Sequence, residues 1–384
     1  MSAEERRGGS DRSAPGPSAM WPDGFASAAA DRRAALVLSA LRGITPRRLL
    51  SLGREHGTAS AVLAEIREGR AGGDADRAFA ADLDPDAIAA AARACGARIV
   101  PWGAVEYPVQ LRHVHDPPAL LYVVGAPPPD VTEAVAIVGS RGCSPLGREL
   151  AREIGRAVAR AGGVVVSGAA RGIDAAAHEG ALAADGGTLA VLGCGPDVVS
   201  PRGSRDLIGR IRARGTVMTE HAPGTPPFQR NFPARNRIVA GLCRAAVVVE
   251  GARGSGSMIT AEHAMEFGRD VFAVPGPPTG ALSFVPLQLI RDGATMIRGP
   301  EDLLEDLGLE LDPRDVGERV RLSEEERRVL ARLAGPRLPD AIASELGIGV
   351  PEVVGALMRL ELRGLVRSVG GRFETTLRGS AASG

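Results

Sequence analysis

Between residues 135 and 298 the chain alternates between short apolar runs and longer amphipathic stretches. Six runs rich in β-branched residues are typical of buried strands: VAIVG (135–139), VVVSG (164–168), TLAVLG (188–193), TVMTE (216–220), AVVVEG (246–251) and VFAVPG (271–276). A helical pattern follows each run, which predicts a parallel sheet covered by helices on both faces, a Rossmann-like α/β fold. Nearly every run ends in Gly or Ser. The loops at the carboxyl edge, where ligands bind in such sheets, are therefore small.

The segments before this core predict a tail and a helical domain. Residues 1–28 are rich in Ser, Gly, Pro and charge, and we expect them to be disordered. Residues 29–100 are rich in Ala and Leu, and GITPRRLLSLGREHGTASAVL resembles a SAM or helix–hairpin–helix unit. Such a hairpin either presents backbone N–H groups to a phosphate or serves only for packing; the presence of a single hairpin favours packing. Residues 101–307 then form the Rossmann-like domain.

The segment after the core predicts a third domain. A charged linker at 308–320 precedes residues 321–378, where three amphipathic helices and a Gly-Gly hairpin indicate a winged helix. Its third helix, VPEVVGALMRLELRG, is mostly apolar, and the segment 321–378 holds ten Arg against eight acidic residues. Major-groove reading requires more exposed polar and basic groups, so a protein-contact or accessory role is favoured over duplex reading.

The composition adds a charge asymmetry to this picture. All 46 basic residues of the 384-residue chain are Arg, and they balance 46 acidic residues. From 135 to 298, however, 19 Arg stand against 13 acidic residues, a surplus of six. A basic central domain suggests an anionic partner, although the same Arg excess is also explained by solubility of the helical surface.

Cysteine spacing and hydropathy exclude several classes of protein. Four widely separated Cys residues without a CxxC pair argue against a zinc site or a disulfide scaffold. The sequence shows neither a signal-peptide core nor an apolar run long enough to span a bilayer, so we expect a cytoplasmic protein without membrane contact.

Two loops at the carboxyl edge contain candidate phosphate ligands in the first half of the sheet. Gly139, Ser140 and Arg141 form a tight turn before a helix that begins near Pro145, so free N–H groups and a guanidinium are available to an anion. The second strand runs into SGAARGIDAAAHEGAL (167–182), with small residues that let a ligand approach the backbone. Asp174 and His178 share a helix face there; we interpret them as structural rather than catalytic.

The third loop argues against nucleotide cofactors. Gly193-Cys194-Gly195 begins like a dinucleotide fingerprint, but Val198 stands where GxGxxG requires Gly, and Pro196 breaks the expected helix start. The sequence has no GxxxxGKS or GxxxxGKT motif of a P-loop ATPase. We therefore expect no cofactor, and we interpret Cys194 as a packing residue.

The segment 228–276 carries the densest group of candidates. Phe232 precedes Asn236 and its two flanking Arg residues, so a base could stack on the ring while Arg holds its phosphates; loop packing of Phe232 is the alternative. The run GSGS (254–257) opens a helix and offers a second anion cradle. Glu262 and Glu266 lie further along that helix, on an expected solvated face.

These blocks together resemble one family. GSR, SGAARGIDAAAH, AVLGCGPD, FPARNRIVAGL, VVVEGARGSGSMITA and GRDVFAVPG occur in the order and spacing of the DprA/Smf DNA-processing proteins. The resemblance implies a dimeric, non-enzymatic single-stranded-DNA-binding protein that protects incoming DNA and loads RecA recombinase during natural transformation (competence) and homologous recombination. It also places Arg202 at a position where relatives often carry a basic residue, usually Lys. The sequence departs from the family pattern at Ser200, Ser204, Pro286 and Leu287, which bears on base contacts more than on phosphate contacts.

The expected DNA-binding residues follow from the motifs and the resemblance together. They are Gly139, Ser140, Arg141, Ser167, Gly168, Arg171, Arg202, Phe232, Arg235, Asn236, Arg237, Gly254, Ser255, Gly256 and Ser257. No catalytic residue and no metal ligand is expected. Two alternatives remain: a nucleoside-monophosphate phosphoribohydrolase-like enzyme on the same fold, although EGARGSGSMITAEHA lacks the PGGxGTxxE pattern of such enzymes, and a ligand-sensing transcription factor that uses the winged helix.

Overall fold

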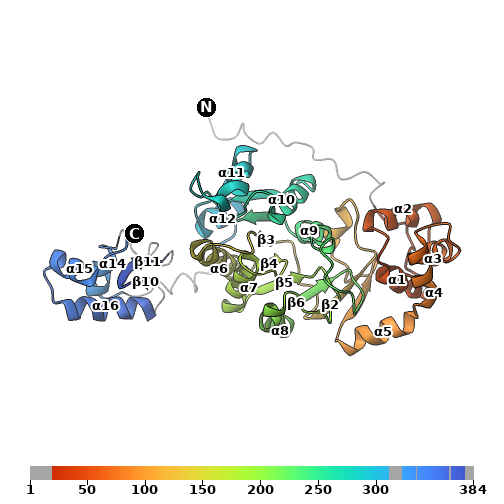
Figure 1. Cartoon of the computed structure of the whole chain (residues 1–384), viewed down its shortest axis with the longest axis horizontal. Helices are drawn as coiled ribbons and strands as arrows, with labels where there is room; N and C mark the ends of the chain where they lie inside the picture. Colours follow the sequence, from red (N-terminus) through yellow and green to blue (C-terminus); the bar gives the residue numbers. More distant parts are fainter. Residues whose placement is uncertain (1–19, 311–321, 334, 363–364, 377–384) are drawn as a thin grey trace. The chain divides into compact units, whose positions relative to one another are not determined.

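The computed structural model describes residues 20–310, 322–333, 335–362 and 365–376 (Figure 1). The chain divides into two compact units, residues 1–310 and 311–384. Residues 1–19 of the expected tail, residues 311–320 of the expected linker, and residues 321, 334, 363, 364, 377 and 378 of the expected winged-helix domain lie outside the described residues.

Five short helices open the first unit. They are α1 (Ala29–Ala40), α2 (Pro46–His56), α3 (Ala59–Arg67), α4 (Asp74–Asp82) and α5 (Pro85–Ala94). The N-caps follow from the sequence, because the side chains of Thr45, Thr58 and Asp84 accept hydrogen bonds from backbone N–H groups in the first turns of α2, α3 and α5. The region is helical, as the pattern predicted.

The predicted tail is too long. Trp21 is 4% exposed and Phe25 is fully buried, and the Trp21 indole packs against Gly53 of α2. Two large aromatic side chains in a Ser/Gly/Pro-rich segment were enough to anchor it, so residues 20–28 belong to the folded unit.

A nine-stranded sheet forms the centre of this unit, in the order β1-β2-β6-β5-β4-β3-β7-β8-β9. The strands are β1 (Arg98–Pro101), β2 (Leu120–Gly125), β3 (Ala134–Val138), β4 (Val164–Ser167), β5 (Gly187–Val191), β6 (Thr216–Thr219), β7 (Ala245–Val248), β8 (Asp270–Ala273) and β9 (Thr295–Met296). From β6 to β9 all neighbours are parallel, whereas β1 and β2 pair antiparallel with each other, and β2 pairs antiparallel with β6. All six apolar runs of the core form strands, which confirms the Rossmann-like prediction.

Helices cover both faces of the sheet (Figure 1). They are α6 (Pro145–Arg160), α7 (Ile173–Ala183), α8 (Arg205–Arg214), α9 (Asn231–Leu242), α10 (Gly256–Glu266), α11 (Phe284–Arg291) and α12 (Pro300–Leu307), with short 3-10 turns η2 (Val109–His113), η3 (Arg202–Ser204) and η4 (Ala281–Ser283). Alternate residues of β2 enter different cores: Tyr122 and Val124 pack on one face of the sheet, Leu121 and Val123 on the other.

The helical region and the sheet are one packed body, not two domains that meet near residue 100. β1 (Arg98–Pro101) crosses that expected boundary as part of the sheet. The core that contains Trp21 and the N-terminal helices also contains Tyr122, whose hydroxyl lies 2.9 Å from Ser39 Oγ. A shared core of this kind fixes the helical region on the sheet.

The second unit is a winged helix. It contains α14 (Glu324–Leu330), α15 (Pro339–Leu346), α16 (Val350–Leu362), β10 (Val366–Val369) and β11 (Arg372–Thr375). Ser323 and Glu326 form a capping box at α14, and Gly370 and Gly371 take positive φ in the hairpin between the strands.

A membrane span requires a helix of sufficient length and apolar composition. Among the described residues no single helix is long and apolar enough to cross a membrane; only the bent pair α15 and α16, taken together, meets that criterion of length and composition.

Candidate nucleic-acid interface

The strand order reverses between β3 and β7. From β3 the chain moves through β4, β5 and β6 in one direction, and then returns to β7 and β8 on the other side of β3. The loops that follow β3 and β7 therefore diverge, and a crevice opens outside the carboxyl ends of these strands. The two loops are joined because Ser140 N donates to the Glu250 carbonyl oxygen at 2.8 Å.

A cleft of about 610 Å³ occupies this switch point. Eleven of the fifteen predicted DNA-binding residues line it: Gly139, Ser140, Arg141, Gly168, Phe232, Arg235, Asn236, Gly254, Ser255, Gly256 and Ser257. We call this cavity the switch-point cleft. The sequence pattern thus brought most of the candidates to one place.

The loop between β7 and α10 is the open part of the cleft. Among the described residues, the backbone N–H groups of Arg253, Gly254 and Gly256 have no hydrogen-bond partner. Gly254 has φ +76°, and Ser255 caps α10 by accepting from Ser257 N at 3.3 Å. Free N–H groups at the positive end of a helix form a concave site for an anion.

The loop between β3 and α6 is partly closed. Ser144 caps α6, but its N–H and hydroxyl both donate to the Glu250 carboxylate, at 2.8 and 2.5 Å. The start of α6 near Pro145 therefore already has a carboxylate partner from the chain itself. What the loop offers the cleft is the Arg141 side chain, which is exposed and lies 5.4 Å from the centroid of the Phe232 ring.

In the loop between β4 and α7, the polar groups that were predicted to bind phosphate already have partners within the chain. Ser167 is fully buried and donates to the Ile137 carbonyl oxygen at 2.6 Å, so its hydroxyl is not available to a ligand. The N–H groups of Gly168 and Ala170 donate to Asp174 Oδ2 at 3.2 and 3.4 Å. Asp174 thus occupies the anion position of this turn, which corrects the prediction for Ser167 and for the backbone of this turn.

His178 and Asp174 are both structural, and they do not pair with each other. His178 Nδ1 lies 2.7 Å from Thr188 Oγ1, and burial lowers the pKa of His178 to about 3, so the ring is neutral. Burial raises the pKa of Asp174, an effect that nearby Arg235 partly opposes.

Arg235 places a buried positive charge at the floor of the cleft. Its side chain is 4% exposed, and Nη1 donates to the Val191 carbonyl oxygen, while Nε has no partner among the described residues. Gly168 makes room for it, because a Cβ atom there would collide with the guanidinium. Burial lowers the pKa of Arg235, yet Arg stays charged in proteins. An anion in the cleft would therefore meet a desolvated cation.

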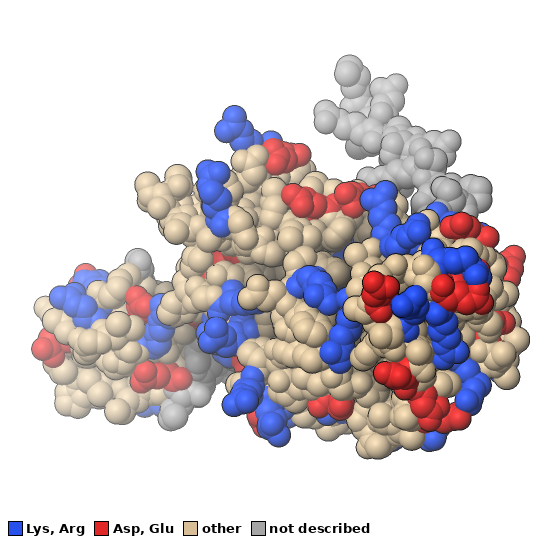
Figure 2. All heavy atoms as spheres, turned by 45° about the vertical axis from the view of Figure 1, so that its right-hand side comes forward, with Lys and Arg blue, Asp and Glu red and all other residues tan. Residues whose placement is uncertain are grey.

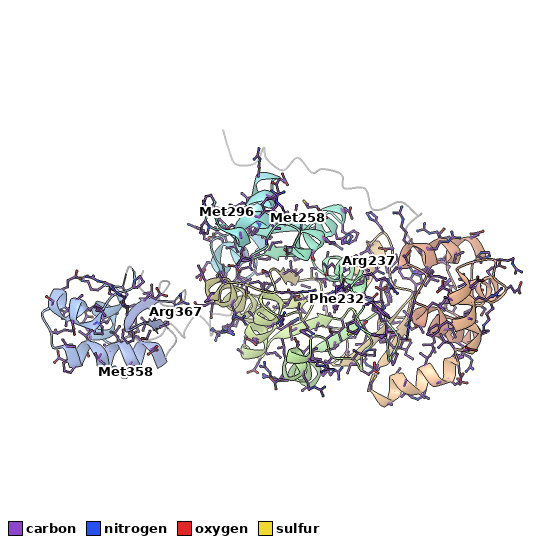
Figure 3. The ribbon with its side chains drawn as sticks, viewed as in Figure 1. Phe232, Arg237, Met258, Met296, Met358 and Arg367 are labelled. Carbon is purple, nitrogen blue, oxygen red and sulfur yellow. The ribbon has the colours of Figure 1, made fainter. Side chains whose placement is uncertain are left out.

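Arg237 was predicted to bind DNA with Arg235, but the structure buries it in ion pairs and it does not line the cleft. Arg237 is 3% exposed; it donates to the Glu220 carboxylate at 2.8 and 2.6 Å, and its Nε lies 3.0 Å from Asp116 Oδ1. Burial opposes the charge on Glu220, but Arg237 outweighs it and lowers the pKa of Glu220. Residues two apart on a helix face different sides, so α9 directs only Arg235 into the cleft. Arg237 lies nearer than Phe232 to the N-terminal helices (Figure 3).

Arg171 and Arg202 do not line the cleft. Both are exposed, on neighbouring loops that are joined by a hydrogen bond from Ser204 Oγ to the Ala169 carbonyl oxygen at 3.3 Å. Figure 2 shows Arg side chains spread over the central part of one face with few acidic side chains among them. These two residues are candidates for a charged rim rather than for direct cleft contacts.

Arg253 is the main residue that the motif analysis missed. It is exposed, lines the cleft together with Ala252, and lies 4.2 Å from the centroid of the Phe284 ring. The signal was its position between Gly251 and Gly254, in the loop that follows β7. Asn236 connects the two sides of the cleft, because its Nδ2 donates to the Gly256 carbonyl oxygen at 3.0 Å.

Comparisons with known proteins agree with this organisation. The family described as DNA recombination-mediator protein A matches residues 98–308, and the DprA winged helix domain matches residues 318–372. Protein Smf of Escherichia coli is 38% identical over 286 residues, covering 72% of this chain and 76% of that protein. DNA processing protein DprA of Streptococcus pneumoniae is 43% identical over 198 residues, covering 52% of this chain and 70% of that protein.

Two solved structures share the fold. The X-ray structure of DprA from Streptococcus pneumoniae has a TM-score of 0.63 at 33% identity, covering 74% of this chain and 99% of that chain. A structure of DNA processing protein A from Helicobacter pylori, described as showing its single-stranded DNA binding mode, has a TM-score of 0.50 at 26% identity and covers 56% of this chain and 97% of that chain.

Proposed function

Since this chain belongs to the DprA/Smf family of DNA-processing proteins, we propose that it binds single-stranded DNA in the switch-point cleft. The observation that carries the proposal is the coincidence of three features in one cavity: the buried Arg235, the exposed Arg141 and Arg253, and the unpartnered N–H groups before α10. The oxygen atoms of a phosphate can accept hydrogen bonds from the donors in all three features.

The strand would be held mainly through its backbone. Guanidinium and N–H groups recognise phosphate without reading sequence, and among the described residues Phe232 is the one aromatic side chain that lines the cleft. We therefore propose binding with little base preference, in which one base stacks beside Phe232 and Arg141.

The chemistry of the cleft supports a binding role rather than an enzymatic one. Asp174 is the carboxylate among its lining residues, and that side chain accepts hydrogen bonds from two backbone N–H groups. The phosphoribohydrolase alternative requires a carboxylate that is free to act on a bound nucleotide. Nor do three His, Cys, Asp or Glu side chains in the described part of the chain gather as a metal site.

Family membership supports the wider role. We propose that the protein acts in the cytoplasm as a homodimer, protects incoming single strands and loads RecA recombinase onto them in natural transformation and homologous recombination. Sedimentation of the full chain tests the dimer. A RecA filament assay with and without the protein tests the loading.

The deciding experiment compares the affinity for single-stranded and double-stranded oligonucleotides over a range of salt concentrations. We expect fluorescence anisotropy to show tighter binding of single-stranded than of double-stranded oligonucleotides, with affinity that falls as salt rises. Each phosphate contact contributes a slope of about 0.7 in log affinity against log salt for single strands. A slope near zero, or equal affinity for duplex, would contradict the proposal.

A further inference from the structure

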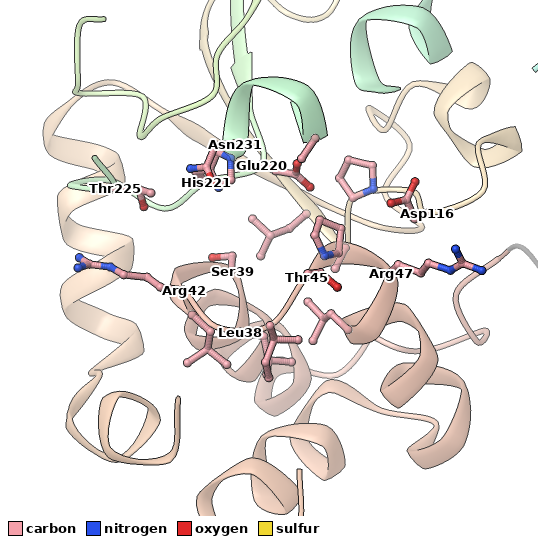
Figure 4. Close-up of a pocket in the computed structure, with 18 of the residues that line it drawn as sticks. Leu38, Ser39, Arg42, Thr45, Arg47, Asp116, Glu220, His221, Thr225 and Asn231 are labelled. Atoms are coloured by element: carbon pink, nitrogen blue, oxygen red, sulfur yellow. The ribbon is translucent and has the colours of Figure 1, made fainter. Parts of the chain in front are cut away.

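A second cavity of about 570 Å³ lies at the same edge of the sheet, between the α1–α2 loop and the loop after β6 (Figure 4). We call it the hairpin pocket. Its volume falls within the range of about 300–1,000 Å³ that is typical of small-molecule sites. The segment that resembles a helix–hairpin–helix unit contributes residues 43–47 and Leu49 to its lining, whereas the predicted DNA-binding residues do not line it.

One wall of the hairpin pocket is apolar. Leu38, Leu41, Ile44 and Leu49 come from α1, α2 and the loop between them, and Leu120 faces them from the start of β2. This wall suits the flat faces of an unstacked heteroaromatic ring.

The opposite wall carries polar groups that lack partners. Asn231 is 8% exposed and Thr225 is 9% exposed, yet among the described residues neither the Asn231 amide nor the Thr225 hydroxyl makes a hydrogen bond. His221 Nε2 is also buried without a partner there. Burial lowers the pKa of His221, so the ring is neutral and has one donor and one acceptor nitrogen. His221 Nε2 itself has almost no accessible surface, so the Asn231 amide and the Thr225 hydroxyl are the donors and acceptors that match the edge of a base.

The mouth of the pocket is cationic. Arg42 and Arg47 lie toward opposite sides of the cavity (Figure 4), and Arg230 Nη2 donates to the Arg42 carbonyl oxygen at 2.8 Å. Arg47 is exposed in the first turn of α2, and its backbone N–H has no hydrogen-bond partner among the described residues. Arg237 pairs with both carboxylates on the wall, Asp116 and Glu220, and offsets one of their two charges. The three Arg residues that line the pocket, Arg42, Arg47 and Arg230, outnumber the remaining charge. The net field at the mouth therefore favours a phosphate.

The hairpin pocket and the switch-point cleft are neighbours along the chain. Phe228, Arg230 and Asn231 line the first, whereas Gln229 and Phe232 line the second. The first turn of α9 is thus the partition between the two cavities, and a strand that leaves one of them need only pass over this turn to enter the other.

We propose that the hairpin pocket is a second nucleotide subsite, which receives an unstacked base of the same strand that the switch-point cleft binds. The base packs on the leucine wall and bonds to Asn231, while Arg47 holds its phosphate. This inference rests on the proposed function. It gives the N-terminal helices a role in the length of DNA that each subunit covers.

Oligonucleotides of increasing length test the proposal with the full-length protein. Anisotropy is measured with strands from about 4 to about 16 nucleotides, the range of common single-strand sites. We expect wild-type affinity to rise with length. Asn231→Leu and Arg47→Ala should leave the shortest strands unaffected and weaken the longest about fivefold, the effect of one lost hydrogen bond or charge contact. Arg48→Ala is the matched control, because Arg48 is exposed on the same turn and does not line the pocket.

The outcomes separate the two proposals. If wild-type protein binds no strand of any length, the proposed function fails. If strands bind but the curves of Asn231→Leu and Arg47→Ala superimpose on wild type at every length, the second subsite fails alone. Calorimetry with a free deoxynucleoside monophosphate distinguishes the source of the base: if Asn231→Leu abolishes mononucleotide binding but changes no strand affinity, the pocket serves a free nucleotide and continuation of the strand is overturned.

Discussion

Two glycine-rich loops at the same sheet edge look alike in sequence and differ in what they can bind. The β4–α7 loop reads SGAARG, and the β7–α10 loop reads GARGSGS. In the first, Asp174 accepts hydrogen bonds from the Gly168 and Ala170 N–H groups. In the second, the N–H groups of Arg253, Gly254 and Gly256 have no such partner within the described chain. A small-residue turn before a helix is therefore an anion site only where the chain does not supply its own carboxylate.

The largest expected effect on single-strand affinity comes from placing a carboxylate in the β7–α10 loop, whose free N–H groups have no acidic partner. Gly256→Asp places an acid in the first turn of α10, where a Cβ meets only ordinary contacts. A negative charge there should hold or raise stability by about 0.3–1 kcal/mol and yet weaken single-strand binding by at least about tenfold, since it repels phosphate.

Gly256→Asn is the control for that change, because it has nearly the same shape and no charge. We expect it to bind within about twofold of wild type, the scale of a small surface perturbation. If Gly256→Asp binds as tightly as Gly256→Asn in anisotropy titrations, the open loop is not the phosphate site.

The buried cation at the floor of the cleft, Arg235, can be disturbed through Gly168. Gly168→Ala should force the Arg235 guanidinium to move, because the new methyl group collides with it. We expect single-strand affinity to fall about fivefold, in keeping with a weakened charged contact. Gly209→Ala, at an exposed helical position with open space around it, controls for the loss of glycine. Equal affinities of the two variants would exclude Arg235 from phosphate binding.

The β4–α7 loop, in which Asp174 already accepts from the N–H groups, allows the opposite test: removal of a carboxylate. Asp174→Asn keeps an oxygen for the Gly168 and Ala170 N–H groups and removes the negative charge near Arg235. With that charge gone, the field of Arg235 in the cleft strengthens, and affinity for single strands should rise about threefold. Unchanged or weaker binding at low salt would show that Asp174 does not tune the cleft.

The same substitution has a pH signature in stability. Burial raises the pKa of Asp174 in the folded protein above its unfolded value of about 3.9. The carboxyl group then contributes stability below that unfolded value, and the contribution is lost as pH rises through the folded pKa. Urea unfolding should therefore show that the free energy of unfolding of Asp174→Asn increases relative to that of wild type as pH rises. A constant difference between the two proteins across this range would contradict the assignment.

The sequence pattern predicted the strands and most of the cleft residues, because both depend mainly on residues that are neighbours in the chain. The six apolar runs formed the parallel strands, and their Gly and Ser ends gathered most candidates into one cleft. Arg237 could not be predicted in the same way: one of its partners, Asp116, is 121 residues away, and nothing in the neighbourhood of Arg237 indicates the pair. Asp174 is different, since an acid in the first turn of α7 was a readable sign that the preceding turn is capped.

The smallest expected effect concerns Arg171 and Arg202, which lie on the closed side of the edge and outside the cleft. Exposed charges act on a strand only through the screened field, whose range is about 10 Å at 0.1 M salt. Arg171→Ala and Arg202→Ala should each weaken binding by about twofold at low salt and have no effect at high salt.

Arg141→Ala should instead lower affinity at both salt concentrations, because its guanidinium is part of the cleft. If the rim variants lose as much affinity as Arg141→Ala, the strand runs over the closed loop, and the distinction between the two loops does not govern where DNA binds.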